Sequence, residues 1–385
     1  MLALYAAHLL LAWAIAPSNI ALGLTILALP IAWRRELRLD VAARAPARLA
    51  IAYLLLLVAA IAASPAPYES ARALSELFSF ATLFLTLLLV RGERQVRWLV
   101  DLLLLSGALL AVWGLVQILF GYGALDSRIR GPFSHYMTFS GFLLVLDLLL
   151  IARLVARREV AGGRGPTAWL DRPWVAWSAL TALTAALVAS LTRGAWVALV
   201  GALVLVVARW RPKLLWAAPA LAALFLLLAP VPVVARGLSI VDLSDSSNYD
   251  RLCMAEAGLR MVGERPLLGV GPEQVRRIYP LYRHPTAPRI VVPHLHNAYL
   301  QLAAERGIPA LSALVALLLT AILAAERGVR RGGTAVDLHL GFLGAVAAFA
   351  IAALFEDNWG DTEVKRLALF LLAGPFCVSR EPAAR

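Results

Sequence analysis

Two histidines, His294 and His296, stand in the segment HLHNAYLQL, directly before a long apolar stretch. A neutral imidazole, with an ordinary pKa of about 6.5, can accept a proton from a hydroxyl group at neutral pH. Asn297 follows His296 and could orient the imidazole or a substrate. His135, in RGPFSHYMTF, begins another apolar stretch. Histidine is also a common interfacial side chain, so these positions are compatible with a general base and with a structural role.

Arginines form the second group of residues that could do chemistry. Arg193 stands between two apolar stretches with almost no loop, where it could bind an anion or extend to lipid headgroups. Arg251 lies in the first turn of a predicted helix, near the helix end that favours anions. A guanidinium binds phosphate oxygens through paired hydrogen bonds. An anionic partner, such as a phosphorylated lipid, is therefore one interpretation, and a solvated basic loop is the other.

Composition predicts the elements that must position these side chains. The 385 residues are 61% hydrophobic and 16% charged, whereas soluble domains have about 25% charged residues. Apolar stretches that are long enough to cross a bilayer recur along the chain, so we expect an all-α polytopic membrane protein with about 12 transmembrane helices. The predicted spans are 2–16, 18–33, 47–63, 74–90, 97–120, 137–155, 173–191, 194–209, 214–235, 298–325, 334–355 and 363–379.

The basic residues predict the orientation. The net charge is +12, and arginines and lysines follow the even-numbered spans. The positive-inside rule then places both termini in the cytoplasm. Because the charge reflects topology, we expect no nucleic-acid partner. Three regions follow: transmembrane spans in 1–235, a long outer loop with short helices in 236–297, and further spans with a cytoplasmic tail in 298–385.

The outer loop contains a predicted amphipathic helix. Residues 246–248 are N-cap types, and Gly263 and Pro266 are expected to end the helix. Apolar residues at helical spacing predict which face is buried, namely Leu252, Ala255, Leu259 and Val262.

The stretch HNAYLQLAAERGIPA resembles the signature of the O-antigen ligase and O-antigen polymerase family. That signature is His, then Asn, Ser or Gln, nine residues, Gly, two residues, and Gly, Thr or Tyr. His296, Asn297 and Gly307 match it, and Ala310 departs at the last position. Further similar segments are SLTRG (190–194), DRLCMAEAGLRMVGERPLLGVGP (250–272) and GPFSHYMTFSG (131–141).

The resemblance implies an inverting, metal-independent glycosyltransferase of the GT-C type in the bacterial inner membrane, with its active site on the periplasmic face. Such enzymes take a glycan from undecaprenyl pyrophosphate. They transfer it to a sugar hydroxyl, of lipid A core in a ligase or of a growing glycan in a polymerase. Carried over by position, the general base is His296, and the arginines that bind the donor pyrophosphate are Arg193 and either Arg251 or Arg265.

The chemistry fits these residue types. Pyrophosphate is a good leaving group, so no general acid is required, and paired arginines can stabilise its charge. We expect no metal ion and no other cofactor, and the partners are the donor, the acceptor and membrane lipids. Asp361 and Glu363, in GDTEV, are expected to be structural partners of nearby arginines.

Other functions remain open at this point. The compact spacing from His296 to Gly307 is the ligase signature and favours a ligase over a polymerase, and a protein O-oligosaccharyltransferase is a third possibility. A transporter with about 12 spans belongs to a different class. The sequence shows no repeated half, and Asp147 is the one carboxylate well inside an apolar run, which makes a poor proton relay.

Overall fold

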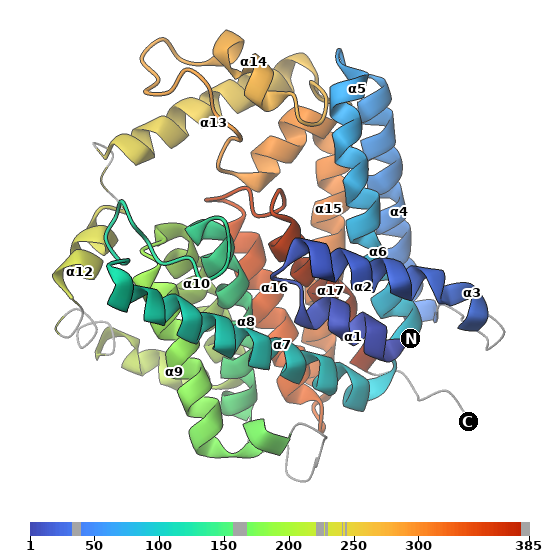
Figure 1. Cartoon of the computed structure of the whole chain (residues 1–385), viewed down its shortest axis with the longest axis vertical. Coiled ribbons are helices and arrows are strands. Elements are labelled where there is room, and N and C mark those ends of the chain that lie inside the picture. Colours follow the sequence, from blue (N-terminus) through green and yellow to red (C-terminus); the bar gives the residue numbers. More distant parts are fainter. Residues whose placement is uncertain are drawn as a thin grey trace.

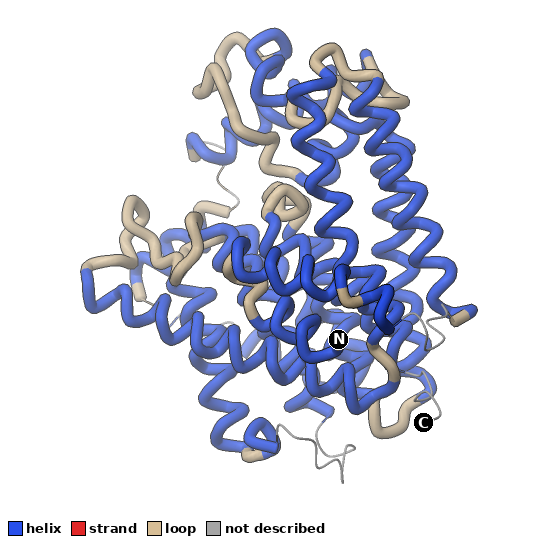
Figure 2. The backbone as a smooth tube through the Cα atoms, turned by 45° about the vertical axis from the view of Figure 1, so that its right-hand side comes forward, coloured by secondary structure: helices blue, strands red, loops and turns tan. Residues whose placement is uncertain are grey.

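The computed structural model describes residues 1–32, 40–156, 168–220, 227, 230–240, 242 and 245–378, and every regular element among them is a helix (Figures 1 and 2). The apolar part consists of α1 (Leu2–Leu10), α2 (Ile15–Leu27), α3 (Leu29–Ala32), α4 (Val41–Ala62), α5 (Pro67–Ser70), η1 (Ala71–Leu74), α6 (Ser75–Leu89), α7 (Gly92–Val116), η2 (Gln117–Phe120), α8 (Tyr136–Ala156), η4 (Ala168–Asp171), α9 (Pro173–Ala189), α10 (Arg193–Trp210), η5 (Pro212–Ala217), α15 (Ala298–Arg331), α16 (Val336–Ala352) and α17 (Thr362–Val378). The predicted outer loop contains α12 (Val231–Leu238), α13 (Ser246–Glu264) and α14 (Val275–Tyr282).

The helical membrane architecture is confirmed in its coarse form. Among the described residues, six helical segments are long and apolar enough to cross a bilayer, namely Val41–Ala62, Pro67–Leu89, Gly92–Phe120, Tyr136–Ala156, Arg193–Trp210 and Ala298–Arg331. Three shorter apolar helices are Ile15–Leu27, Pro173–Ala189 and Val336–Ala352. The middle of the predicted span 214–235, namely residues 221–226, 228 and 229, lies outside the described residues. The number of spans and the GT-C type therefore stay predictions.

The first two predicted spans are shorter than expected. The segment 2–16 contains the 9-residue helix α1, which at 1.5 Å per residue is about 14 Å long and covers about half of a bilayer core. Pro17 lies in the first turn of α2 and has no N–H to donate to a preceding turn, so α1 cannot continue into α2. The two helices pack against each other as a hairpin, with α7 beside α1 and α6 beside α2.

Helix α16 lies at the centre of the protein. It packs against α8, α10 and α15, and almost all of its residues are buried. A helix that is apolar around its whole circumference is stable only when other helices surround it. The two ends of α16 therefore have defined positions, and the loop that follows it is held close to the start of α15.

Helix α15 is broken at Gly307, the glycine of the family-like signature. Its backbone angles, φ 83° and ψ 166°, belong to a region that essentially only glycine occupies. The chain that follows α13 fills the break: Val270 N–H donates to the carbonyl of Ala304 (2.8 Å), and Ile308 N–H donates to the carbonyl of Pro266 (2.8 Å). The break thus connects the outer loop to the helix that begins just after His296.

The predicted loop helix exists as α13, and Val262 packs against the loop core with Ala255 half-buried, but the prediction is wrong for Leu252 and Leu259. Leu252 is 53% exposed and Leu259 is 65% exposed. The buried face consists instead of small or flexible side chains, namely Cys253, Met254, Ala257, Gly258 and Met261. These residues allow close packing: a Cβ at position 258 would lie 2.7 Å from Leu300 in α15. Both faces of α13 are partly apolar, so periodicity alone did not identify the buried one.

The break at Gly307 predicts the effect of adding one methyl group. The Cβ of a Gly307→Ala protein would overlap the carbonyl of Leu267, which is backbone and cannot turn away. Gly332 is a matched control, since it has similar angles (φ 69°, ψ −152°) and open space around it. We expect Gly332→Ala to lower stability by about 1–3 kcal/mol and Gly307→Ala to lower it further. Thermal melting in detergent measures both, and equal losses would contradict the packing argument.

Candidate active site

His296 and His294 are held by one carboxylate, that of Glu356. The carboxylate belongs to the loop after α16, and the histidines belong to the loop before α15. His296 Nδ1 lies 3.0 Å from Oε2 of Glu356, and His294 Nε2 lies 3.6 Å from Oε1. His296 has a positive φ of 50°, a conformation that costs free energy for a side chain other than glycine. The surrounding contacts therefore enforce this position.

The hydrogen bonds define which imidazole nitrogen is free. The backbone N–H of His296 donates to Nδ1 of His294 (3.3 Å), so the proton of a neutral His294 lies on Nε2 and faces Glu356. His296 donates its Nδ1 proton to Glu356, which leaves a lone pair on Nε2. Of the two side chains, His296 is thus the one that can accept a proton.

The charges of this cluster are consistent with that assignment. Burial alone would raise the pKa of Glu356, but the hydrogen bond from His296 and the nearby His296, His294 and Arg251 lower it. Burial lowers the pKa of His294, with Glu356 opposing the change. Glu356 is therefore ionised at neutral pH and accepts from His296, and His294 is a neutral neighbour whose Nε2 lies 3.6 Å away.

Asn297 has a positioning role in this structure. Its side-chain oxygen accepts a hydrogen bond from the N–H of Leu300 (2.9 Å) and so caps α15. Its amide nitrogen donates to the carbonyl of Leu354 (3.2 Å), just before Glu356. Both ends of the Asn297 amide therefore bind backbone, and the residue joins the two loops that supply the histidines and the carboxylate.

A cavity of about 550 Å³ opens beside His296 and Glu356. We call it the arginine cavity, because Arg128, Arg236 and Arg251 line it. Burial lowers the pKa values of Arg236 and Arg251, and the neighbouring arginine charges lower them further. Like charges brought together in this way are stabilised by an anion. The cavity is therefore suited to a phosphorylated group next to a proton acceptor.

Arg193 lies in the same cluster, but its guanidinium already has protein partners. It is 6% exposed and donates to the carbonyl of Ser239 (2.7 Å), to the Ser239 hydroxyl (2.9 Å) and to Asp245 (3.2 Å). Asp245 is also the N-cap of α13. Arg193 thus fastens the start of α13, which carries Arg251. It also lines a small pocket with Arg128, Arg236 and Arg251.

The structure separates the two alternative loop arginines. Arg251 lies in the first turns of α13 and lines the arginine cavity. Arg265 is the exposed residue that ends α13, about 21 Å further along at 1.5 Å per residue, and lines neither large cavity. His135 is at the rim of the arginine cavity, where its ring stacks at 4.2 Å on Tyr136.

Several site residues were not predicted from the sequence. Glu356 stands in the acidic stretch FEDNWGD after a predicted span, which is the one signal that could have identified it. Arg128 and Arg236 looked like ordinary loop residues. Asp361 was expected to pair with an arginine, but it accepts a hydrogen bond from Thr138 (2.9 Å) and lines the arginine cavity.

The helices and this cavity together define a membrane-embedded protein with a polar site next to an outer loop. Residues 178–315 match the family model described as O-antigen ligase. The matched segment is about a third of the chain, is similar to the O-antigen ligase family, and contains Arg193, Arg251, His296 and Gly307. This family implies an enzyme that transfers glycosyl groups. No curated protein matches the chain.

The Asp361 carboxyl predicts a pH dependence of stability. Burial raises its pKa to about 7, above an ordinary value of about 3.9. Between these values the folded protein holds a proton that the unfolded chain has released, so stability falls as pH rises through this window and levels off above it. The Asp361→Asn protein should lose less stability between about pH 5 and about pH 8 than the wild type. Thermal melting at both pH values tests this, and parallel pH profiles would contradict it.

Proposed function

We propose that the protein is an inverting, metal-independent glycosyltransferase that moves a glycan from undecaprenyl pyrophosphate to a sugar hydroxyl of lipid A core, as an O-antigen ligase does. One observation carries the proposal: a proton-accepting imidazole, oriented by a carboxylate, faces a cluster of arginines in one cavity. A sugar donor whose leaving group is pyrophosphate requires both features.

In the proposed reaction, His296 Nε2 accepts the proton of the acceptor hydroxyl, and Glu356 stabilises the imidazolium that forms. The acceptor oxygen bonds to the anomeric carbon from the side opposite the pyrophosphate. The bond between that carbon and the pyrophosphate oxygen breaks, and undecaprenyl pyrophosphate leaves with the electron pair. Arg128, Arg236 and Arg251 stabilise the charge that develops on it.

The proposed setting is the bacterial inner membrane, with both termini in the cytoplasm. Residues 236–297 then form the periplasmic loop, and the two flanking regions, 1–235 and 298–385, contain the spans. In this orientation the arginine cavity opens at the periplasmic face, where the donor glycan is displayed. A polymerase that extends a lipid-linked glycan would use the same donor and the same residues, as would a protein O-oligosaccharyltransferase.

The base assignment predicts two variants with large effects. His296→Ala should reduce kcat at least 100-fold, and Glu356→Gln should reduce it about 100-fold, because a general base contributes factors of this order. His284 is a matched control in the same loop, since it contacts Thr286 (2.6 Å) and lines neither cavity. Transfer of glycan from undecaprenyl pyrophosphate to lipid A core, resolved on a gel, measures the rates. Wild-type activity of His296→Ala would refute the mechanism.

The same assay tests the independence from metal ions. Ligand atoms of His294, His296 and Glu356 lie within 4.8 Å of one another and could hold a metal ion. If these groups act as base and positioning residue, transfer proceeds fully in EDTA. Loss of activity in EDTA, restored by a divalent ion, would replace the general base with a metal site. Lengthening of the donor glycan without lipid A core would identify a polymerase.

The donor assignment predicts different effects for two arginines on one helix. Inorganic pyrophosphate should raise the melting temperature of the wild type, and Arg251→Ala should weaken its binding about tenfold through the loss of charged hydrogen bonds. Arg265→Ala is the matched control at the other end of α13 and should bind as the wild type does. Equal effects of the two substitutions would remove Arg251 from the donor site.

A further inference from the structure

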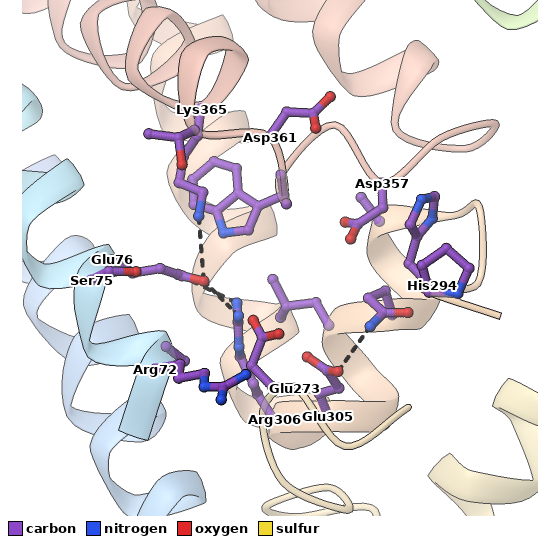
Figure 3. A pocket seen from close by; sticks show the side chains of 18 of the residues that line it. Arg72, Ser75, Glu76, Glu273, His294, Glu305, Arg306, Asp357, Asp361 and Lys365 are labelled. Atoms are coloured by element: carbon purple, nitrogen blue, oxygen red, sulfur yellow. Dashed lines mark hydrogen bonds and ion pairs between the residues drawn. The ribbon is translucent and has the colours of Figure 1, made fainter. Parts of the chain in front are cut away.

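Figure 3 shows a second cavity, of about 540 Å³, which shares part of its lining with the arginine cavity. Pro293, His294 and Asp361 line both of them. Two consecutive residues give one carboxylate to each cavity: Glu356 lines the arginine cavity, and Asp357 lines the second one. We call the second one the acidic cavity. The histidine loop therefore stands between two chambers of similar size.

The buried side chains in the wall of the acidic cavity form hydrogen bonds and ion pairs with one another. Glu76 accepts a hydrogen bond from Tyr53 (2.9 Å) and pairs with Arg306 (2.5 Å) and Lys365 (3.5 Å). All of these side chains are less than a tenth exposed. Arg306 and Lys365 both pair with Glu76, so these side chains are held in place, and two cations face one carboxylate in this part of the wall.

Asp357 is one group in this cavity with unused binding capacity. Figure 3 shows its side chain beside His294, with the carboxylate directed into the cavity. No hydrogen bond to this carboxylate comes from another residue of the described chain. Gln301 also lines the cavity. Its amide nitrogen donates to Glu305 (2.9 Å), and its amide oxygen accepts from the N–H of Leu295 (2.9 Å). An open carboxylate therefore lies next to polar groups that are already fixed in place.

The charges of the lining indicate the class of ligand. Six carboxylates and four cations line the acidic cavity among the described residues. Burial raises the pKa values of Asp357 and Asp361, so part of this lining is uncharged near neutral pH, and the cavity offers mixed polar groups to a ligand. Carboxylates accept hydrogen bonds from hydroxyl groups, and the volume is in the usual range for a small-ligand site. A hydroxyl-rich, uncharged or cationic molecule fits these walls.

We propose that the acidic cavity binds the sugar end of the acceptor, with Asp357 accepting hydrogen bonds from its hydroxyl groups. The role as acceptor rests on the proposed function, whereas saccharide binding does not. An acceptor held there extends its reacting hydroxyl past His294 toward His296. It approaches from the side away from the arginines that hold the leaving group, as inversion requires.

A substitution at the rim tests the proposal without disturbing the buried network. Ser75 is the exposed first residue of α6 and lines the acidic cavity, so Ser75→Trp should fill it. Ser75→Ala is the matched control, because it removes the hydroxyl group without adding volume. Asp357→Ala removes the open carboxylate. Thermal protection by inorganic pyrophosphate, measured for each variant, shows whether the arginine cavity remains intact.

The ligands are two fluorescently labelled saccharides that distinguish the possible acceptors. One is the core oligosaccharide released from rough lipopolysaccharide, and the other is the glycan released from undecaprenyl pyrophosphate. We expect the full-length protein to bind one of them in fluorescence polarisation. Ser75→Trp and Asp357→Ala should weaken that binding at least tenfold, while Ser75→Ala and pyrophosphate protection remain as in the wild type.

Other results would overturn the proposal in distinguishable ways. Failure of the wild type to bind either saccharide, or unchanged binding in both Ser75→Trp and Asp357→Ala, would place the acceptor elsewhere. In transfer assays the two variants should raise the acceptor KM at least tenfold with little change in kcat. If saccharide binding is lost in these variants but the wild type transfers no glycan, the proposed function fails and the saccharide site stands.

Discussion

The carboxylate of Glu356 is the interaction on which the site depends. It accepts from His296 and faces His294, and it connects the loop after α16 to the loop before α15. A carboxylate that is partly removed from water is costly unless it has a donor, and here His296 donates to it while His294 lies 3.6 Å away. The central position of α16 and the cap formed by Asn297 bring the loops together. The proposed proton acceptance by His296 thus depends on how two distant segments pack.

The arginine cluster is the second constraint. Arg236 and Arg251 have lowered pKa values because they are buried near other guanidinium groups. Arg193 offsets part of this repulsion by binding Ser239 and Asp245. The remaining positive charge favours an anion in the cavity, and the same charge helps to keep Glu356 ionised. One electrostatic arrangement therefore serves both the proposed leaving group and the proposed base.

The break in α15 at Gly307 links these features to the outer loop. The loop after α13 hydrogen-bonds to carbonyls of the last turn before the break, at Ala304 and Glu305. Glu305 and Arg306 then line the acidic cavity. The stretch from His296 to Gly307 thus describes one continuous piece of structure: the proposed base, the helix that positions it, and the break that anchors the loop.

The sequence by itself determined the helical membrane architecture and the loop helix α13, and it selected His296 as a candidate, because hydrophobic content, caps and a spaced motif are local properties of the chain. It also selected Arg193 and Arg251, but it could not separate Arg251 from Arg265, which differ only in their place along one helix. Tertiary structure decided the buried face of α13 and the partnership of His296 with Glu356. Both depend on contacts between segments that are distant in the sequence, such as the contact of His296 with Glu356 across 60 residues. Local residue spacing does not predict such contacts.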